Sequence, residues 1–376
     1  MYSSSQIPWD EVGPGWFLLD YDPADVRQPW PGEGPQPAVA DTLTLISPDG
    51  ALYAAGDIAS AQATELAGWV GEELYLYRAT DSHIWWMTGD EITFDMIDGT
   101  SVVTRMGTEF WGAVRPTALT PAADGYAVRR GTTQEESGTL RAYRDGTFSH
   151  VVAEDAFSDL SPDGTGVVSF VGRDDGTTDV FFNAVDGTRT HLQVLTLPGG
   201  GGSEFRGWLS NDVVLLTRTT ILEGPTEMSN SVGNAVAYGP TLVFALDTRT
   251  GDATEYSLPF DTDQGDWLYS PDLSAFVYRA YGGGSDVVFY SLDGDVLTSV
   301  PCEHCHAVIS SGVAISGDRA VVFDLSRTPL EMGGEPGPQH AVVTLVWPAE
   351  RRTTVIADIT SEVGVVQTVF GHPNVY

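Results

Sequence analysis

Evenly spaced hairpin turns predict that this 376-residue chain is all-β, a single seven-bladed β-propeller with four-stranded antiparallel blades. Seven times, a run of alternating apolar residues ends at a tight polar turn and another apolar run begins. Gly is common in these turns because it adopts a positive φ at no steric cost. The turns recur at roughly 40 to 60 residues, the spacing of propeller blades. Their last residues are Gly50, Thr100, Gly146, Thr188, Gly251, Gly294 and Arg351.

The first blade is expected to take strands from both ends of the chain. Residues 15–20 and 42–46 alternate as strands before the first turn, but no inner strand precedes them. The C-terminal run 363–370 is apolar and has no hairpin of its own. We therefore expect this run to join the N-terminal blade as its inner strand and to close the ring, because closure removes exposed sheet edges. A stray edge strand is the alternative.

The remaining blades follow in chain order. The second covers roughly residues 66–106, where 82–88 and 91–97 both have a strand pattern. The third covers about 110–152 on the same plan. Blades four to six have the clearest runs of strand length with period-two alternation. Their expected strands are 157–164 (an inner strand that ends in a turn), 166–171, 179–185 and 189–195; then 207–212, 213–219, 241–246 and 253–258; then 267–272, 275–279, 286–292 and 296–300.

The charge balance is strongly acidic. The chain has 52 acidic and 18 basic residues, all of the latter Arg, which gives a formal net charge of −34. Phosphate contacts need clustered cations, so this balance excludes nucleic acid and anionic membranes as partners. Three interpretations of this negative charge stay open. It keeps the protein soluble, with Arg encoded in place of Lys; it suits a salty habitat; or it binds calcium or cationic partners. No apolar stretch is long enough to span a membrane.

The N-terminus indicates an exported protein. Residues 1–10 are small, polar and then aromatic, and we interpret them as a tether before a propeller of residues 11–376. They contain no signal peptide, since a charged start and an apolar segment are missing. We expect an extracytoplasmic protein, secreted or tethered to the cell envelope, whose leader is absent from this chain. A cytoplasmic protein with a frayed N-terminus is the alternative.

One repeated motif resembles a known family. Ser161-Pro162-Asp163-Gly164 follows an apolar pair and precedes a strand, a gap and an apolar run into Asp186-Gly187. This pattern resembles the WD40-like repeat of TolB-type propellers. It is partial in blade six, where Leu273 replaces Gly, and altered in blade five; in blade one it falls at the outer hairpin. The resemblance covers the repeat architecture, implies an extracytoplasmic scaffold or binding propeller, and carries no catalytic residues.

Three long connections indicate where a ligand would bind. Residues 21–41, 220–240 and 326–340 each join the second and third strands of a blade, so they should open on one face. Long loops on one face of a rigid ring mark a ligand surface. Tolerated insertions are the alternative, because surface loops accept length at low entropic cost.

The two cysteines lie in one short segment that opens on the same face. A short-loop disulfide between Cys302 and Cys305 suits an exported protein. A transition-metal site is an alternative, with His340 completing the ligands. The spacing also matches c-type haem attachment, without the helical segment that haem needs, and two reduced thiols are a further alternative. The candidate metal ligands are Cys302, His304, Cys305, His306 and His340.

Two acidic runs, 261–266 and 173–179, group carboxylates as calcium loops do, but neither has the full calcium-loop pattern. We interpret them as solvated turns. No nucleophile motif occurs, and we assign no catalytic residue.

The sequence therefore predicts a non-enzymatic, monomeric propeller without a cofactor that binds a protein or envelope component. Glu303, His304, His306 and His340 are the candidate contact residues on its loop-rich face. Fold alone is a weak guide to function, so two alternatives stay open. One is a metal-dependent hydrolase or lyase with an ion in the propeller channel. The other is a redox or metal-handling protein built around residues 302–306, with calcium or a transition metal as the bound ion.

Overall fold

The structure, a computed structural model, consists almost entirely of β-strands. It describes residues 2–22, 39–60, 64–70, 73–79, 92–98, 101–107, 116–122, 125–130, 140–144, 147–153, 160–173, 177–195, 203–222, 237–281, 286–302, 313–327, 339–361 and 365–371. Two single-turn 3-10 helices, η1 (Ser4–Gln6) and η2 (Trp9–Glu11), precede the first strand. None of the helices among these residues is long and apolar enough to cross a membrane.

The strands in this part of the chain form seven antiparallel sheets. Their orders are β27-β1-β2-β3, β4-β5-β6-β7, β8-β9-β10-β11, β12-β13-β14, β15-β16-β17-β18, β19-β20-β21-β22 and β23-β24-β25-β26. The bounds are β1 (Phe17–Asp22), β2 (Val39–Ile46), β3 (Leu52–Ser60), β4 (Thr64–Val70), β5 (Glu73–Ala79), β6 (Ile92–Asp98), β7 (Ser101–Gly107), β8 (Pro116–Ala122), β9 (Gly125–Arg130), β10 (Leu140–Arg144), β11 (Thr147–Ala153), β12 (Gly166–Gly172), β13 (Thr178–Ala184), β14 (Arg189–Leu195), β15 (Ser203–Ser210), β16 (Val213–Leu222), β17 (Ala237–Asp247), β18 (Ala253–Glu255), β19 (Gly265–Ser270), β20 (Ala275–Ala280), β21 (Val287–Ser291), β22 (Val296–Val300), β23 (Val313–Ser316), β24 (Arg319–Arg327), β25 (Gln339–Trp347), β26 (Arg352–Ser361) and β27 (Val365–Gly371).

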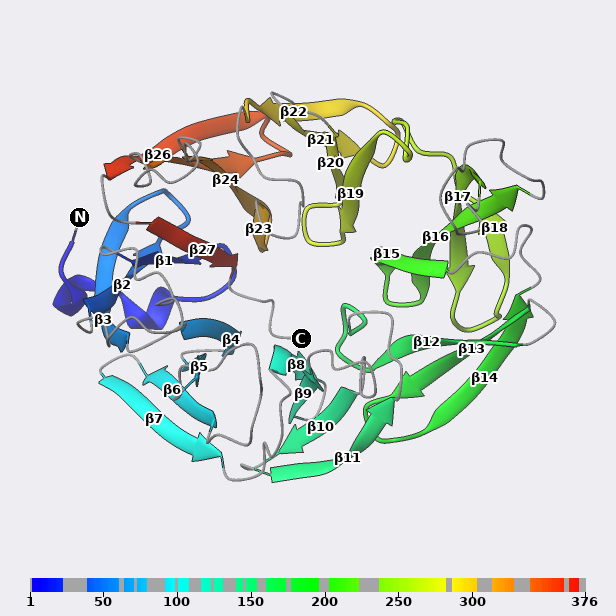
Figure 1. Cartoon of the computed structure of the whole chain (residues 1–376), viewed down its shortest axis with the longest axis horizontal. Coiled ribbons are helices and arrows are strands. Elements are labelled where there is room, and N and C mark those ends of the chain that lie inside the picture. The colour runs from blue at the N-terminus through cyan, green and yellow to red at the C-terminus, as the bar shows by residue number, and fades with distance from the viewer. Residues whose placement is uncertain are drawn as a thin grey trace, which may run out of the picture.

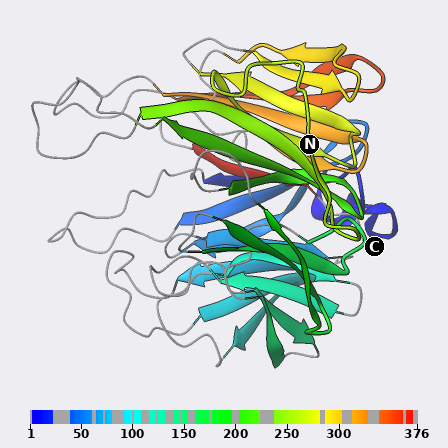
Figure 2. The same cartoon turned by 90° about the vertical axis from the view of Figure 1, so that its right-hand side faces the viewer.

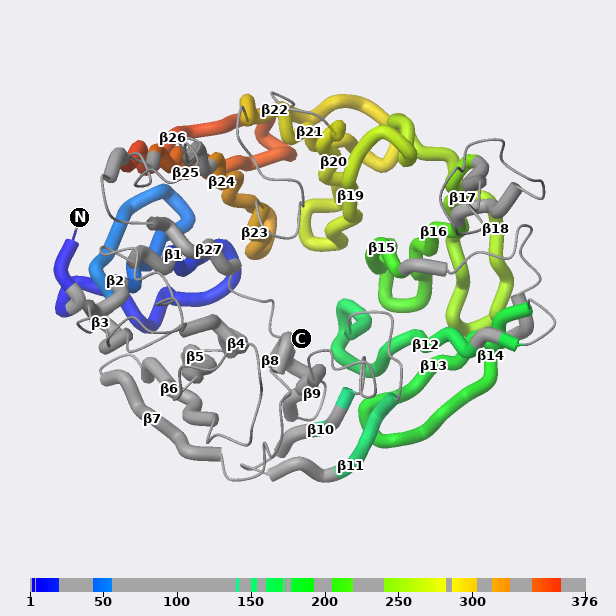
Figure 3. Tube along the Cα trace, in the orientation of Figure 1, coloured from blue at the N-terminus to red at the C-terminus, as the bar shows by residue number. Residues whose placement is uncertain are grey.

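The sheets stand side by side around a common centre, in the order of the chain (Figure 1). The first strand of each four-stranded sheet lies nearest the centre and the last lies at the rim. This is the arrangement of a β-propeller, in which each sheet packs only against its two neighbours. The coloured parts of the chain trace in Figure 3 follow one another in the same order.

The two ends of the chain meet in the first sheet. β27 lies antiparallel to β1, with Leu18 opposite Phe370 and Tyr21 opposite Val366. The register shifts between Asp20 and Tyr21, as at a β-bulge. The C-terminal run thus occupies the position that the sequence left without a strand.

Two expected strands fall partly or wholly outside the described residues. Residues 160–164 form the turn that was expected at the end of the inner strand of the fourth blade, and residues 157–159 lie outside the described residues. The described part of the fourth sheet therefore has three strands, β12 to β14, where four were expected. In the second sheet, residues 92–98 form β6, whereas 82–88 lie outside the described residues.

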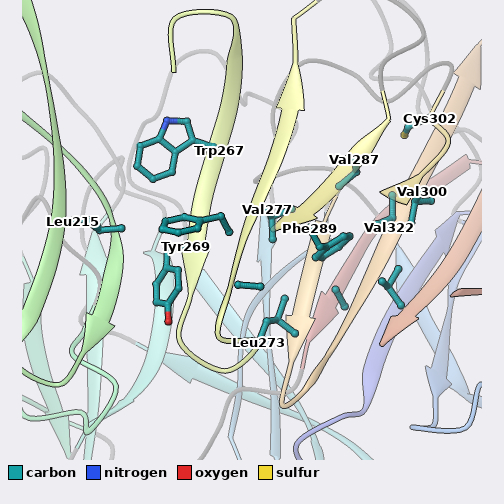
Figure 4. Packing of buried hydrophobic residues seen from close by; sticks show 14 of the residues in the cluster. Leu215, Trp267, Tyr269, Leu273, Val277, Val287, Phe289, Val300, Cys302 and Val322 are labelled. Carbon is teal, nitrogen blue, oxygen red and sulfur yellow. The ribbon is translucent and has the colours of Figure 1, made fainter. Parts of the chain in front are cut away.

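Apolar rows between neighbouring sheets form the core. Among the described residues, the largest apolar cluster joins the fifth, sixth and seventh sheets. Figure 4 shows Trp267 and Tyr269 on the side of the sixth sheet that faces Leu215 of β16. Phe289 lies on the other side, toward Val322 of β24. Each such side chain contributes roughly 1.5–3 kcal/mol when fully buried, so these rows supply most of the adhesion between sheets.

The N-terminal segment packs on the first sheet. The Tyr2 backbone donates to Leu52 O (2.7 Å) and accepts from Ala54 N (2.9 Å), so Tyr2 extends the sheet beyond β3. Ile7 and Val12 are buried in one cluster with Trp16. Tyr2 and Ile7 of the segment expected as a tether, residues 1–10, therefore contact the first sheet, and the use of this segment as a tether stays a prediction.

Both Ser-Pro-Asp-Gly turns have the same hydrogen bonds, although they occupy different hairpins. Ser161 Oγ donates to Asp163 Oδ1 (2.6 Å) and accepts from Thr165 N (3.1 Å). Ser47 makes the equivalent contacts with Asp49 and Ala51. The Gly in each turn has a positive φ, 67° at Gly164. The motif therefore encodes a turn that is closed by its own side chains.

The turn predicts a specific acid sensitivity. Burial opposes ionisation of Asp163, but hydrogen bonds from Ser161 and Thr165 outweigh burial and lower the pKa of its carboxyl. A carboxyl whose pKa is lower in the folded state stabilises the fold above its unfolded pKa, and this contribution is lost as the pH falls through the folded pKa. Asp163→Asn should therefore reduce stability by about 1 kcal/mol at neutral pH.

The difference from the parent should shrink as the pH falls below the ordinary aspartate range, and it should vanish once the pH is below the lowered pKa of Asp163. Thermal melts from neutral to acidic pH measure this difference. Asp293→Asn, in the exposed turn after β21, is the matched control and should change little. A deficit of Asp163→Asn that is equal at both ends of the pH range would contradict the assignment.

The β27–β1 pairing predicts a large effect of a short deletion. Removing residues 365–376 strips the first sheet of its innermost strand and exposes the edge of β1. We expect the melting transition to broaden and to shift to lower temperature, as calorimetry would show. Removing only 372–376 is the control and should leave the transition unchanged. Identical melts for the two deletions would show that β27 does not hold the ring.

Candidate functional site

The sheets have two different ends. Turns between the first and second strands, and between the third and fourth, lie at one end, which we call the turn end. Connections between the second and third strands, and from one sheet to the next, lie at the opposite, loop end. Figure 2 shows the strands from the side, with the N-terminal 3-10 turns (dark blue) at the same end as the short hairpins. The two ends of the sheets therefore differ in the length of the connections that leave from them.

Several pairs of described strands are joined by long connections that leave from the loop end. Residues 23–38 separate β1 from β2, 223–236 separate β16 from β17, and 328–338 separate β24 from β25. These three segments lie outside the described residues, but the strands that lead into them are described. β16 and β17 have 10 and 11 residues, whereas the neighbouring β20 and β21 have 6 and 5. The expected ligand face thus coincides with the loop end.

The cysteine segment begins in the core. Cys302, which follows β22, is 1% exposed and belongs to the apolar cluster with Val300 and Val322. Glu303, His304, Cys305 and His306 lie outside the described residues. The Cys302–Cys305 disulfide and the display of the two histidines therefore stay predictions.

His340 lies near the start of β25, at the loop end of the seventh sheet. Its Nε2 is 2.6 Å from Asp358 Oδ1 on β26, and both side chains are about half exposed or more. This contact places His340 between the two outer strands of its sheet. Within the described ranges, no group of three or more His, Cys, Asp or Glu side chains could hold a metal ion. The five-ligand metal site of residues 302–306 and 340 therefore stays a prediction.

The acidic run 261–266 uses its carboxylates on the protein itself. Asp261 Oδ1 accepts from Asp263 N (3.0 Å), and the Asp263 carboxylate accepts from Thr241 N (3.2 Å). Asp266 Oδ1 accepts from Trp267 N (3.0 Å). These contacts close a turn in which Asp261 and Asp263 are exposed, and the exposure agrees with the solvated turn that the sequence favoured.

The run 173–179 also forms an ion pair. Both nitrogens of the Arg173 fork, Nε and Nη2, donate to the Asp179 carboxylate at 2.6 Å, and His191 Nε2 lies 2.8 Å from Asp179 Oδ1. The hydrogen bond from Arg173, followed by that from His191, lowers the pKa of Asp179. Bidentate pairs of this kind fix geometry, so this cluster ties the start of β13 to β14.

An arginine joins the fifth and sixth sheets close to the loop end. Arg206 on β15 donates through Nε to Thr217 Oγ1 (3.2 Å), and its Nη1 lies 3.6 Å from Asp266 Oδ1 on β19. The guanidinium also stands over the ring of Trp267, 5.6 Å from its centre. Charge pairing and ring contact therefore hold two inner strands together at this level.

Two further arginines are buried within strands. Arg218 on β16 is 2% exposed and Arg279 on β20 is 8% exposed. Among the described residues, Nε of each has no hydrogen-bond partner, and neither has Nη1 of Arg218. The sequence-based reasoning missed both. The available signal was an Arg inside an apolar strand run, Val213-Val214-Leu215-Leu216-Thr217-Arg218, where a charge is costly to bury.

Comparisons with known proteins return distant structural likenesses. No family model and no curated protein matches the chain. A protein from Lactobacillus plantarum is 13% identical, with a TM-score of 0.44 over 94% of this chain and 98% of its own. An oligogalacturonate lyase in complex with manganese is 11% identical, with a TM-score of 0.46 over 86% and 82%. A puromycin hydrolase is 15% identical, with a TM-score of 0.47 over 86% and 51%. At these values none of them informs on the function of this chain.

Proposed function

We propose that the chain is an exported, non-enzymatic propeller that binds a protein or a cell-envelope component through its loop end. In this proposal it has seven blades with TolB-type repeats, and β27 closes the ring. It works as a monomer outside the cytoplasm. The proposal assigns no catalytic residue and needs no cofactor.

The contrast between the two ends of the sheets carries the proposal. At the turn end, hairpins such as 161–165, 185–188 and 292–295 are short and closed by their own backbone hydrogen bonds. At the loop end, long connections leave a rigid scaffold, and the exposed Tyr281 follows β20 at the same end. Binding residues are concentrated on loops that a rigid scaffold positions, so the loop end is the better docking face.

The remaining candidate residues belong to the same end. Residues 303–306 come after β22, which ends at the loop end, and His340 is the second residue of β25, which begins at the loop end. In the proposal, a Cys302–Cys305 disulfide stiffens this segment, and Glu303, His304, His306 and His340 face the partner. A short-range disulfide contributes little unfolded-state entropy, so its role would be local rigidity.

Site-specific cross-linking tests which end binds. We would place a photo-reactive phenylalanine analogue at Tyr281, directly after β20 at the loop end, where the side chain is 63% exposed. The matched control carries it at Leu292, 46% exposed in the hairpin after β21 at the turn end. We expect a discrete cross-linked product from position 281 in the native cell envelope. Cross-links of equal yield at both positions, or at 292 alone, would overturn the proposal.

A further inference from the structure

Arg218 is a buried cation for which the described chain supplies no counter-charge. Its side chain is 2% exposed, and Nε and Nη1 have no hydrogen-bond partner. Burial lowers the pKa of Arg218, and no neighbouring charge contributes to that shift. The chain has 52 acidic residues, so the missing carboxylate is not explained by composition.

The position of Arg218 is set by strand alternation. On β16, Val214 and Leu216 face the fourth sheet, where they pack in one cluster with Phe170 and Val180. Arg218 is the next residue on that face, because side chains two apart on a strand point the same way. It lies opposite Leu242 of β17, four residues before β16 ends at Leu222. The guanidinium thus continues an apolar row toward the loop end.

An unpaired guanidinium in such surroundings is costly. Removing an ion from water costs several kcal/mol, and a partner with good geometry is needed to offset that cost. The planar fork of Arg matches the two oxygens of a carboxylate, which it binds bidentately. A ligand that pairs with the Arg218 guanidinium would therefore be an oxyanion, and it would approach from the loop end.

We propose that Arg218 forms an oxyanion site between the fourth and fifth sheets, which takes a carboxylate from outside the chain. The carboxylate belongs either to a free small molecule or to an acidic side chain of the partner. The second source rests on the proposed function, whereas the first does not. In both cases the ligand supplies the counter-charge that the described residues lack.

Thermal melts at constant ionic strength test the site with two probes, sodium acetate and an acidic tetraglutamate peptide, against sodium chloride as reference. A ligand that binds only the folded state raises the melting temperature in a saturable way. We expect a rise on the order of 2–4 °C with at least one probe. A rise in melting temperature with acetate would indicate that the site takes a free small carboxylate. A rise with the peptide only would indicate that it takes an acidic side chain of a partner.

Two variants make the test specific. Arg218→Met keeps the length of the side chain and removes the charge, so it should abolish the response. In chloride it should melt no lower than the parent, because an uncompensated buried charge has been removed. Arg249→Gln is the matched control, since Arg249 is 70% exposed and pairs with Asp212 at 3.4 Å, and it should keep the full response.

Three results would overturn the proposal. The first is no response of the parent protein to either probe. The second is an equal response in Arg218→Met, which would place the anion elsewhere. The third is an Arg218→Met protein that is unfolded or melts far below the parent in chloride, which would mean that Arg218 already has a partner within the chain. The melts contain no partner protein, so a negative cross-linking result at position 281 would leave them unaffected.

Discussion

β27 pairs with β1 and so joins the two ends of the chain, and we expect the rest of this fold to depend on that pairing. Each sheet of a propeller packs only against its neighbours, so an open ring would expose two apolar sheet faces. Here β27 lies beside β1, and the first and seventh sheets share a cluster that includes Phe17, Val321 and Val343. A buried hydrogen bond from Gly15 N to Ser316 Oγ (2.7 Å) joins the same two sheets at the turn end. The contacts between sheets are local, but the ring holds only if its first and last elements meet.

Much of this fold could be predicted from the sequence because its signals are local. Hairpin turns depend on Gly and Asp at defined positions, and strand faces depend on alternation, so the strands of the fifth and sixth sheets lie close to their expected ranges. The pairing of β27 with β1 is not local, yet it was predicted because the first sheet otherwise lacked an inner strand. The N-terminal segment was harder to place. Ile7 and Val12 look like isolated apolar residues, and only the tertiary structure shows the sheet that buries them.

The candidate site was less predictable for a physical reason. Sequence motifs identify residues that lie close together along the chain, such as the Cys and His residues of 302–306. Loop length identifies residues at the end of a long connection, such as His340. Arg206 and Arg218 come from strand interiors, and their importance depends on which sheet each one faces. His340 was expected near the cysteine segment, and its described contact is Asp358 on the neighbouring strand. Alternation along a strand shows which residues share a face, but it does not show which neighbouring sheet that face contacts.

Native-state hydrogen exchange measures the central constraint most directly. Amides in the β1–β27 ladder, between Leu18 and Tyr21 and between Val366 and Phe370, should exchange only through global unfolding. Their exchange free energies should therefore equal those of the β19–β20 ladder in the sixth sheet and should fall with denaturant at the same slope. If the β27 amides exchange much faster than the β19 amides, by local opening that is insensitive to denaturant, then the chain ends do not close this ring.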